Sequence, residues 1–187
     1  MLLLPAALLA TTLTAQTLVW PVQRMHTPSS SLQRLSEAER QTVMKLIRPE
    51  LGPLFQGDAP AALDQAIRSF RAERINIGAS AVALLPASGE LCGTTGNCSF
   101  WIVDLTHRRV LLHTDAIQSF AVDVLKPHTM PIIYTNTHNS TAESEMIRWH
   151  YIDGRYARDS CATLNNADDS GAPLKESRIT PHPCNVD

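Results

Sequence analysis

The residues best suited to catalysis in this sequence are its seven histidines, because an imidazole can bind a metal or move a proton near neutral pH. They are His26, His107, His113, His128, His138, His150 and His182. His113 and Asp115 stand two residues apart, so in a strand both side chains point to the same side. His138 is followed by Glu143 and Glu145, which form a second candidate cluster in a loop. Either group has the chemistry of a hydrolase.

The compact sequence signatures of enzymes are nevertheless absent. Zinc hydrolases place two histidines one helical turn apart, and no such pair occurs. The segment Gly78-Ala79-Ser80-Ala81-Val82 lacks the closing glycine of a serine nucleophile elbow, and there is no phosphate-binding loop. We therefore assign no catalytic, cofactor-binding or metal-binding residue, expect no cofactor, and favour a non-enzymatic role over an enzymatic one.

The four cysteines have the chemistry of structural disulfides. They are Cys92, Cys98, Cys161 and Cys184. An even number of cysteines suits an oxidising compartment, and pairing each with its nearest neighbour predicts bridges 92–98 and 161–184. The entropy of loop closure gives about 2.4 kcal/mol for the first and about 3.5 kcal/mol for the second. Free thiols and a four-thiolate zinc site are the alternatives, although no Cys-x-x-Cys pair is present.

The first fifteen residues predict export. Residues 1–15 carry no charge, are rich in leucine and alanine, and end at the small residue Ala15, as a cleaved signal peptide does. The sequence lacks the usual leading basic residue, and Leu13 is larger than the residue a signal peptidase prefers. An uncleaved anchor is the alternative, and a membrane attachment is expected only in that case. The predicted location is secreted or periplasmic.

Charge and composition limit the partners. The formal net charge is −2 and no basic run occurs, which excludes the electrostatic binding typical of nucleic-acid and anionic-membrane proteins. Residues 16–35 are rich in proline and serine and predict a linker with little to bury. Hydrophobic residues make up 44% of the chain, enough for one ordinary core, so residues 36–187 predict a single domain.

Two helices are expected at the start of this domain. Ser36-Glu37-Ala38-Glu39 matches a capping box and predicts a helix that Pro49 ends. A second helix is expected from near Asp58, with an apolar stripe of Leu63, Ile67 and Phe70 and with Arg68, Arg71 and Arg74 on more exposed positions.

Strands are expected from residue 75 onward. Apolar or alternating runs predict strands at 81–85, 99–105, 110–112, 117–125, 132–134 and 146–152. Asp153-Gly154 predicts a two-residue hairpin turn, because both residues tolerate positive φ. The polar tail after Cys161 is expected to depend on its disulfide. The prediction is an α+β fold in which N-terminal helices pack on one antiparallel meander of five to seven strands.

Two motifs carry a resemblance. Cys92-Gly-Thr-Thr-Gly-Asn-Cys98 precedes the apolar strand 100–103, and a Tyr-x-Asp-Gly-x-Tyr hairpin spans residues 151–156. This pattern resembles small exported bacterial proteins of uncharacterised function and covers roughly residues 68–161. The resemblance implies export, an α+β fold and the bacterial envelope, and it implies no catalytic residues.

The leading hypothesis is a non-enzymatic domain that binds an envelope or extracellular ligand, whether protein, peptide or glycan. A disulfide-closed loop at 92–98 would serve it as a rigid recognition element or would simply hold the strand register. The alternatives are a hydrolase that uses His113, Asp115 or His138, and a structural spacer that keeps its leader. The sequence does not identify the ligand or the oligomeric state.

Overall fold

The structure is a computed structural model that describes residues 20–22, 25, 33–51, 60–77, 80–86, 91–126, 129–168 and 170–184. The predicted leader, Asp58, and the side chain of Ile67 lie outside the described part. No helix among the described residues is long and apolar enough to cross a membrane.

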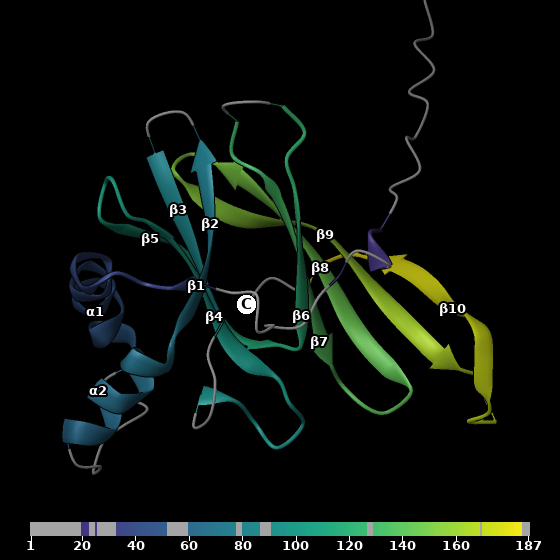
Figure 1. The fold of residues 1–187 in the computed structure, drawn as a ribbon. Helices are drawn as coiled ribbons and strands as arrows, with labels where there is room; N and C mark the ends of the chain where they lie inside the picture. The colour runs from purple at the N-terminus through teal and green to yellow at the C-terminus, as the bar shows by residue number, and fades with distance from the viewer. Residues whose placement is uncertain are drawn as a thin grey trace, which may run out of the picture.

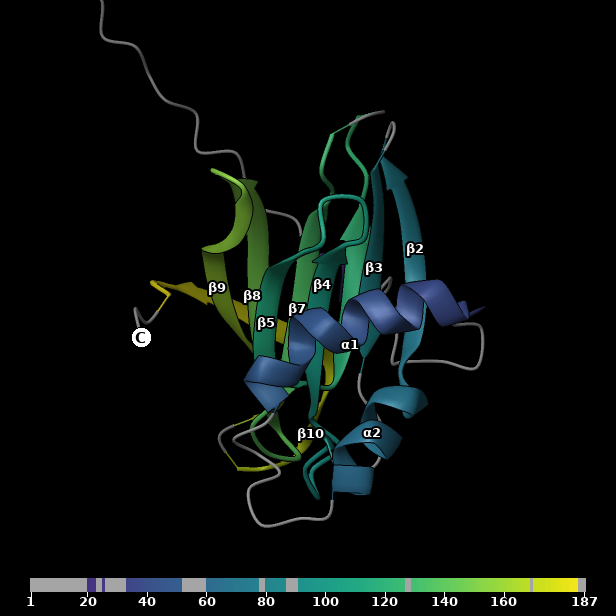
Figure 2. The same cartoon turned by 90° about the vertical axis from the view of Figure 1, so that its left-hand side faces the viewer.

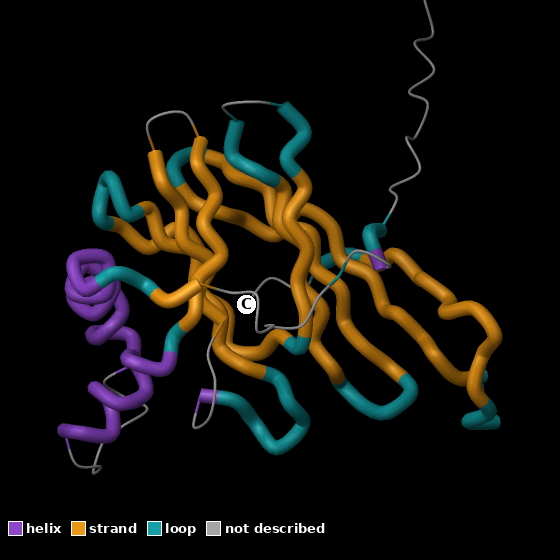
Figure 3. The backbone as a smooth tube through the Cα atoms, in the orientation of Figure 1, coloured by secondary structure: helices purple, strands orange, loops and turns teal. Residues whose placement is uncertain are grey.

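The described chain is α+β, as predicted, and its helices precede most of its strands. The helices are α1 (Glu37–Leu51) and α2 (Pro60–Ser69). The strands are β1 (Gln33–Arg34), β2 (Arg71–Ile77), β3 (Ser80–Pro86), β4 (Cys98–Asp104), β5 (Arg109–Ile117), β6 (Ser119–Asp123), β7 (Ile132–His138), β8 (Glu143–Ile152), β9 (Arg155–Ala167) and β10 (Pro173–His182). Helices and strands occupy separate regions of the molecule (Figure 3).

The strands form two antiparallel sheets, where a single meander of five to seven strands was predicted. Sheet 1 has the order β1-β2-β3-β4-β5, and sheet 2 has the order β10-β9-β8-β7-β6 (Figure 1). The chain changes sheet at Gln118, whose backbone N–H donates to the carbonyl of Asn136 in β7 at 2.7 Å. Sequence patterns locate strands but do not show which consecutive strands pair with each other. The division into two sheets was therefore not predictable from them.

Three buried clusters give the fold its layers. The outer face of sheet 1 shares a cluster with the helices, in which Val43 and Ile47 of α1 accompany Trp101 and Val103 of β4. Helix α1 runs across this face in Figure 2. A second cluster, which includes Phe100, lies between the sheets, and a third covers the far face of sheet 2. Because both its faces are covered, β4 is buried along its whole length.

The predicted capping box begins α1. The Ser36 N–H donates to Glu39 Oε2 at 2.8 Å, and the Glu39 N–H donates to Ser36 Oγ at 3.4 Å. The predicted end at Pro49 is wrong, because the helix continues to Leu51. Proline in the last turn removes one helical hydrogen bond, and Leu51, which is completely buried, keeps the turn in place by packing.

The arginines expected on exposed helix positions lie partly in a strand. Arg71 and Arg74 belong to β2, which begins immediately after Phe70. The Arg74 guanidinium binds the Glu39 carboxylate through Nε at 2.9 Å and Nη2 at 2.5 Å. This long-range ion pair joins β2 to α1, and no local sequence pattern around Arg74 predicts it.

Both ends of the described chain carry structure that the sequence analysis did not predict. Within the predicted linker, Trp20 is only 8% exposed and packs on the far face of sheet 2, against the ring of Tyr134. The polar tail forms β10, which pairs with β9 from Pro173 to His182. The backbone hydrogen bonds of an edge strand do not require apolar side chains, so the polar composition of this segment did not indicate a strand.

The hairpin turn at Asp153-Gly154 is confirmed. Asp153 has φ of 50° and Gly154 has φ of 89°, as a type I′ turn requires. The turn joins β8 to β9, which pair from Ile152 and Arg155 back to Glu143 and Asn165. The sequence therefore placed the longest hairpin of sheet 2 correctly.

Candidate functional site

A cavity of about 630 Å³ lies between the free edge of β5 and the start of the β8–β9 hairpin, and we refer to it as the cleft. Its wall consists of Glu50, Val110, Leu111, Leu112, His113, Trp149, Arg155, Tyr156, Arg158 and Cys184. The wall therefore combines an aliphatic strand, two aromatic rings, two arginines and a disulfide sulfur.

Beside the cleft, β5 is linked to sheet 2 by a side-chain hydrogen bond near each of its ends. At one end Arg109 Nη2 donates to Tyr151 Oη at 2.9 Å. At the other end Thr137 Oγ1 donates to the Ala116 carbonyl. Between these ties the β4–β5 register shifts twice, once on each side of residues 112–114. Register shifts of this kind bend a strand and increase its twist.

His113 is held rigidly at the wall of the cleft. Its ring stacks on the Trp101 indole with centroids 4.6 Å apart and planes 8° from parallel. Its Nδ1 lies 3.3 Å from Glu50 Oε2, and its Nε2 lies 2.9 Å from Asp115 Oδ1. Trp101 Nε1 also donates to Glu50 Oε2 at 2.9 Å. The predicted His113 and Asp115 pair is thus brought together, with Glu50 and Trp101 as partners that the sequence did not suggest.

This arrangement suits positioning better than catalysis. His113 Nε2 is buried and makes no aligned hydrogen bond, although it faces Asp115. A general base must offer a nitrogen to the substrate proton at hydrogen-bond distance, and Nε2 of His113 is buried while Nδ1 lies against the Glu50 carboxylate. The described residues also contain no group of three or more metal-binding side chains.

The second predicted cluster is not assembled. His138 lies in β7, where its backbone N–H and carbonyl both form hydrogen bonds with the side chain of Asn97. Glu143 accepts from Asn139 at 3.4 Å, and Glu145 instead lies 3.2 Å from Nε2 of His182. His26 and His128 lie outside the described residues, and His150 is exposed on β8.

A histidine–carboxylate pair that the sequence analysis missed supports the turn after β4. His107 Nδ1 lies 2.8 Å from Asp104 Oδ2, and the His107 N–H donates to Asp104 Oδ1 at 2.9 Å. Burial alone would raise the pKa of Asp104, but the hydrogen bonds from His107 outweigh it and hold the pKa below its usual value. The spacing Asp-x-x-His is the local signal that could have revealed this pair.

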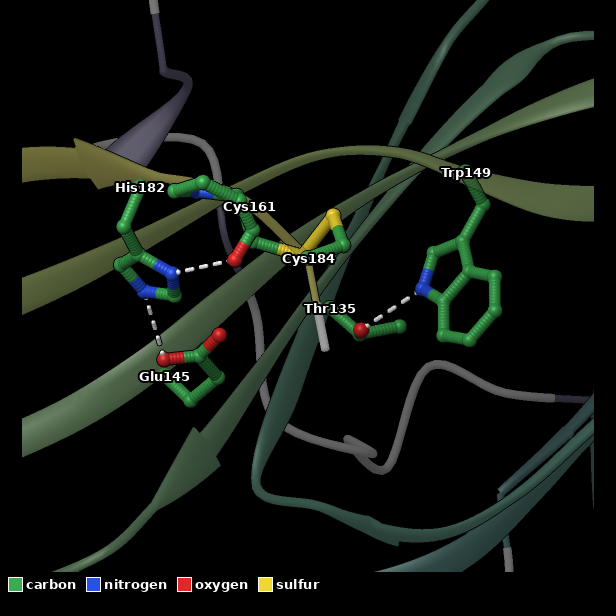
Figure 4. Close-up of a disulfide and its surroundings, with 7 residues drawn as sticks. Thr135, Glu145, Trp149, Cys161, His182 and Cys184 are labelled. Atoms are coloured by element: carbon green, nitrogen blue, oxygen red, sulfur yellow. Dashed lines mark hydrogen bonds and ion pairs between the residues drawn. A yellow bond between two sulfur atoms is a disulfide. The ribbon is translucent and has the colours of Figure 1, made fainter. Parts of the chain in front are cut away.

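Both predicted disulfides are present, as Cys92–Cys98 and Cys161–Cys184. The sulfur of Cys184 in the second disulfide lines the cleft, and His182 and Glu145 lie to one side of this disulfide in Figure 4. The pKa of His182 is raised, first by its hydrogen bond to the Pro183 carbonyl and then by the Glu145 carboxylate. The imidazole of His182 links the end of β10 to Glu145 of β8.

The first disulfide closes a loop that joins the two sheets. Asn97 Nδ2 donates to the His138 carbonyl at 2.8 Å, and the His138 N–H donates to Asn97 Oδ1 at 2.9 Å. The amide side chain thus pairs with β7 as another strand residue would. Gly96, at φ of 80°, allows the tight turn that aims Asn97 at β7.

The aromatic side of the cleft is fixed by buried hydrogen bonds. Trp149 Nε1 donates to Thr135 Oγ1 at 2.8 Å, and Tyr156 Oη donates to the Pro131 carbonyl at 3.0 Å. Burial raises the pKa of Tyr156, so the phenol stays neutral. The Arg158 guanidinium carbon lies 5.6 Å from the centre of the Trp149 ring, a distance at which a cation is attracted to the ring face.

In comparisons with known proteins, no protein-family model, curated protein or solved structure matches this chain.

Proposed function

We propose that this chain is an exported, non-enzymatic binding domain of the bacterial envelope that holds a protein, peptide or glycan ligand in the cleft. The observation that carries the proposal is the cleft itself, whose wall combines pre-positioned aromatic rings with two arginines. Concave, largely apolar sites with a few polar groups are typical of ligand binding.

The proposed location, secreted or periplasmic, has two supports. The charge-free leader of residues 1–15 is typical of exported chains. The two disulfides are typical of an oxidising compartment, since cytosolic thiols are kept reduced.

The experiment compares two double charge reversals of equal size in the exported protein. Arg155→Glu with Arg158→Glu alters the cleft, whereas Lys175→Glu with Arg178→Glu alters the exposed edge strand β10. Each protein is applied to peptide arrays and glycan arrays. Ligands retained by the wild type and by the β10 variant, but lost by the cleft variant, would support the proposal. Equal retention by all three proteins, or no retention on any array, would contradict it.

A hydrolase is the second candidate, and the approach of His113 to Asp115 is the observation in its favour. The matched test replaces His113 by Gln and, as a control, the exposed His150 by Gln. Turnover of ester or peptide substrates that survives in the control and disappears in the His113→Gln variant would establish the hydrolase and overturn the binding proposal.

A further inference from the structure

The position of the cleft relative to β5 indicates what class of ligand could bind there. Val110 packs with the cluster on the helix side of sheet 1, and Leu111 and Leu112 pack with the cluster between the sheets. His113 stacks on Trp101, which also belongs to the helix side. Because side chains from both faces of β5 line the cleft, the cleft must run along the free edge of this strand.

Among the described residues, no other strand pairs with that edge. β5 is the last strand of sheet 1, and within the described residues its strand pairing is to β4 alone. The two register shifts leave residues 112–114 as a regular segment with an irregularity on each side. Bulges of this kind discourage long edge-to-edge association between copies, while a short regular segment still accepts a short peptide.

The charges around the cleft favour an acidic ligand. Arg155 and Arg158 are exposed at its wall. The acidic side chain at the wall, Glu50, is already engaged by Trp101 and lies against His113. Guanidinium groups bind carboxylates in directed, often bidentate pairs, so carboxylate side chains complement this wall.

We propose that the cleft binds an extended acidic peptide segment, which adds a strand to the free edge of β5 at residues 112–114 while its carboxylates face Arg155 and Arg158. This inference rests on the proposed function and specifies its ligand. The backbone pairing supplies affinity, and the carboxylates, which stand at alternate positions of the peptide and share one side of it, meet the arginines.

The probe is the blocked heptapeptide Thr-Val-Glu-Val-Glu-Val-Thr, with a control peptide in which lysine replaces glutamate. Binding to the exported protein is measured by calorimetry, and amide hydrogen exchange of the segment 109–117 is followed by mass spectrometry. The acidic peptide should bind, slow exchange in this segment and leave β10 unaffected. The Arg155→Glu, Arg158→Glu variant should lose at least about tenfold in affinity, equivalent to about 1.4 kcal/mol. The Lys175→Glu, Arg178→Glu variant should not.

A series of N-methylated peptides provides the signature of strand pairing. Successive amides of a strand point to opposite sides, so methylation at alternate positions should abolish binding while methylation at the intervening positions is tolerated. Failure of the acidic peptide to bind, or binding without this alternation and without protection of β5, overturns strand addition. The proposed function fails separately, when the peptide and glycan arrays show no dependence on the cleft arginines.

Discussion

At the scale of single residues, Asn97 has the clearest structural role outside the cleft. Its side chain makes two hydrogen bonds to the backbone of His138, and these link the disulfide loop before β4 to β7 in the other sheet. Removing the amide leaves a partly buried N–H and carbonyl of β7 without their partners, and such groups are costly to leave unpaired.

We predict that Asn97→Ala lowers the free energy of unfolding by about 1–3 kcal/mol, because two hydrogen bonds are lost together. Asn97→Asp should be intermediate, since it keeps the acceptor and loses the donor. Urea unfolding measures both. Asn139→Ala is the matched control, because its amide makes a long 3.4 Å hydrogen bond at the surface. An equal effect of the two alanine variants would contradict the role given to Asn97.

At the scale of elements, the Glu39–Arg74 pair holds α1 against β2. The Glu39 carboxylate accepts hydrogen bonds from Arg74 and from Ser36. The hydrogen bond from Arg74 is the main cause that lowers the pKa of Glu39 from 4.5 to about 2. The same carboxylate thus caps its own helix and anchors that helix to sheet 1.

This depressed pKa predicts how stability depends on pH. The folded state holds the proton of Glu39 more weakly than the unfolded state, so its contribution is complete above about pH 4.5 and is lost as the pH falls towards 2. Glu39→Gln preserves the capping geometry and removes the charge. This substitution should lower the free energy of unfolding by about 1–3 kcal/mol at neutral pH. It should also reduce the loss of that free energy between pH 4.5 and 2. Urea titrations at several pH values test this, and an unchanged pH profile would count against the pair.

At the scale of the whole molecule, helices, sheet 1 and sheet 2 are layered around separate buried clusters, and each disulfide secures a different part. Cys92–Cys98 closes the loop that enters β4. Cys161–Cys184 fastens the end of the chain after β10, and Cys184 also lines the cleft. The two bridges should therefore differ in their effects on binding as well as on stability.

Replacing both cysteines of a pair by serine tests this difference. Loop-closure entropy predicts losses of about 3.5 kcal/mol for Cys161→Ser with Cys184→Ser and about 2.4 kcal/mol for Cys92→Ser with Cys98→Ser. The first variant should also weaken binding of the acidic peptide, because the wall of the cleft loses its attachment to β9. The second should retain that binding. Thermal unfolding and calorimetry measure the two effects, and equal peptide affinities in both variants would refute the structural link between bridge and cleft.

Features encoded within a few residues were predictable from the sequence. The capping box at Ser36 and the turn at Asp153-Gly154 depend on local hydrogen bonds and backbone angles, and both are present. The pairing of the cysteines followed from their short separations along the chain. These features, together with the alternating strands, determined the α+β class.

The cleft was decided by tertiary structure. It depends on the passage of the chain from sheet 1 to sheet 2 at Gln118, on two register shifts in β5, and on hydrogen bonds from Arg109 to Tyr151 and from Thr137 to Ala116. The two hydrogen bonds join residues 21 or more positions apart. Local periodicity does not identify their partners, because many polar side chains and strand edges could form the same hydrogen bonds. Local sequence patterns therefore indicated the helices and many of the strands, and packing between the two sheets determined where the cleft lies.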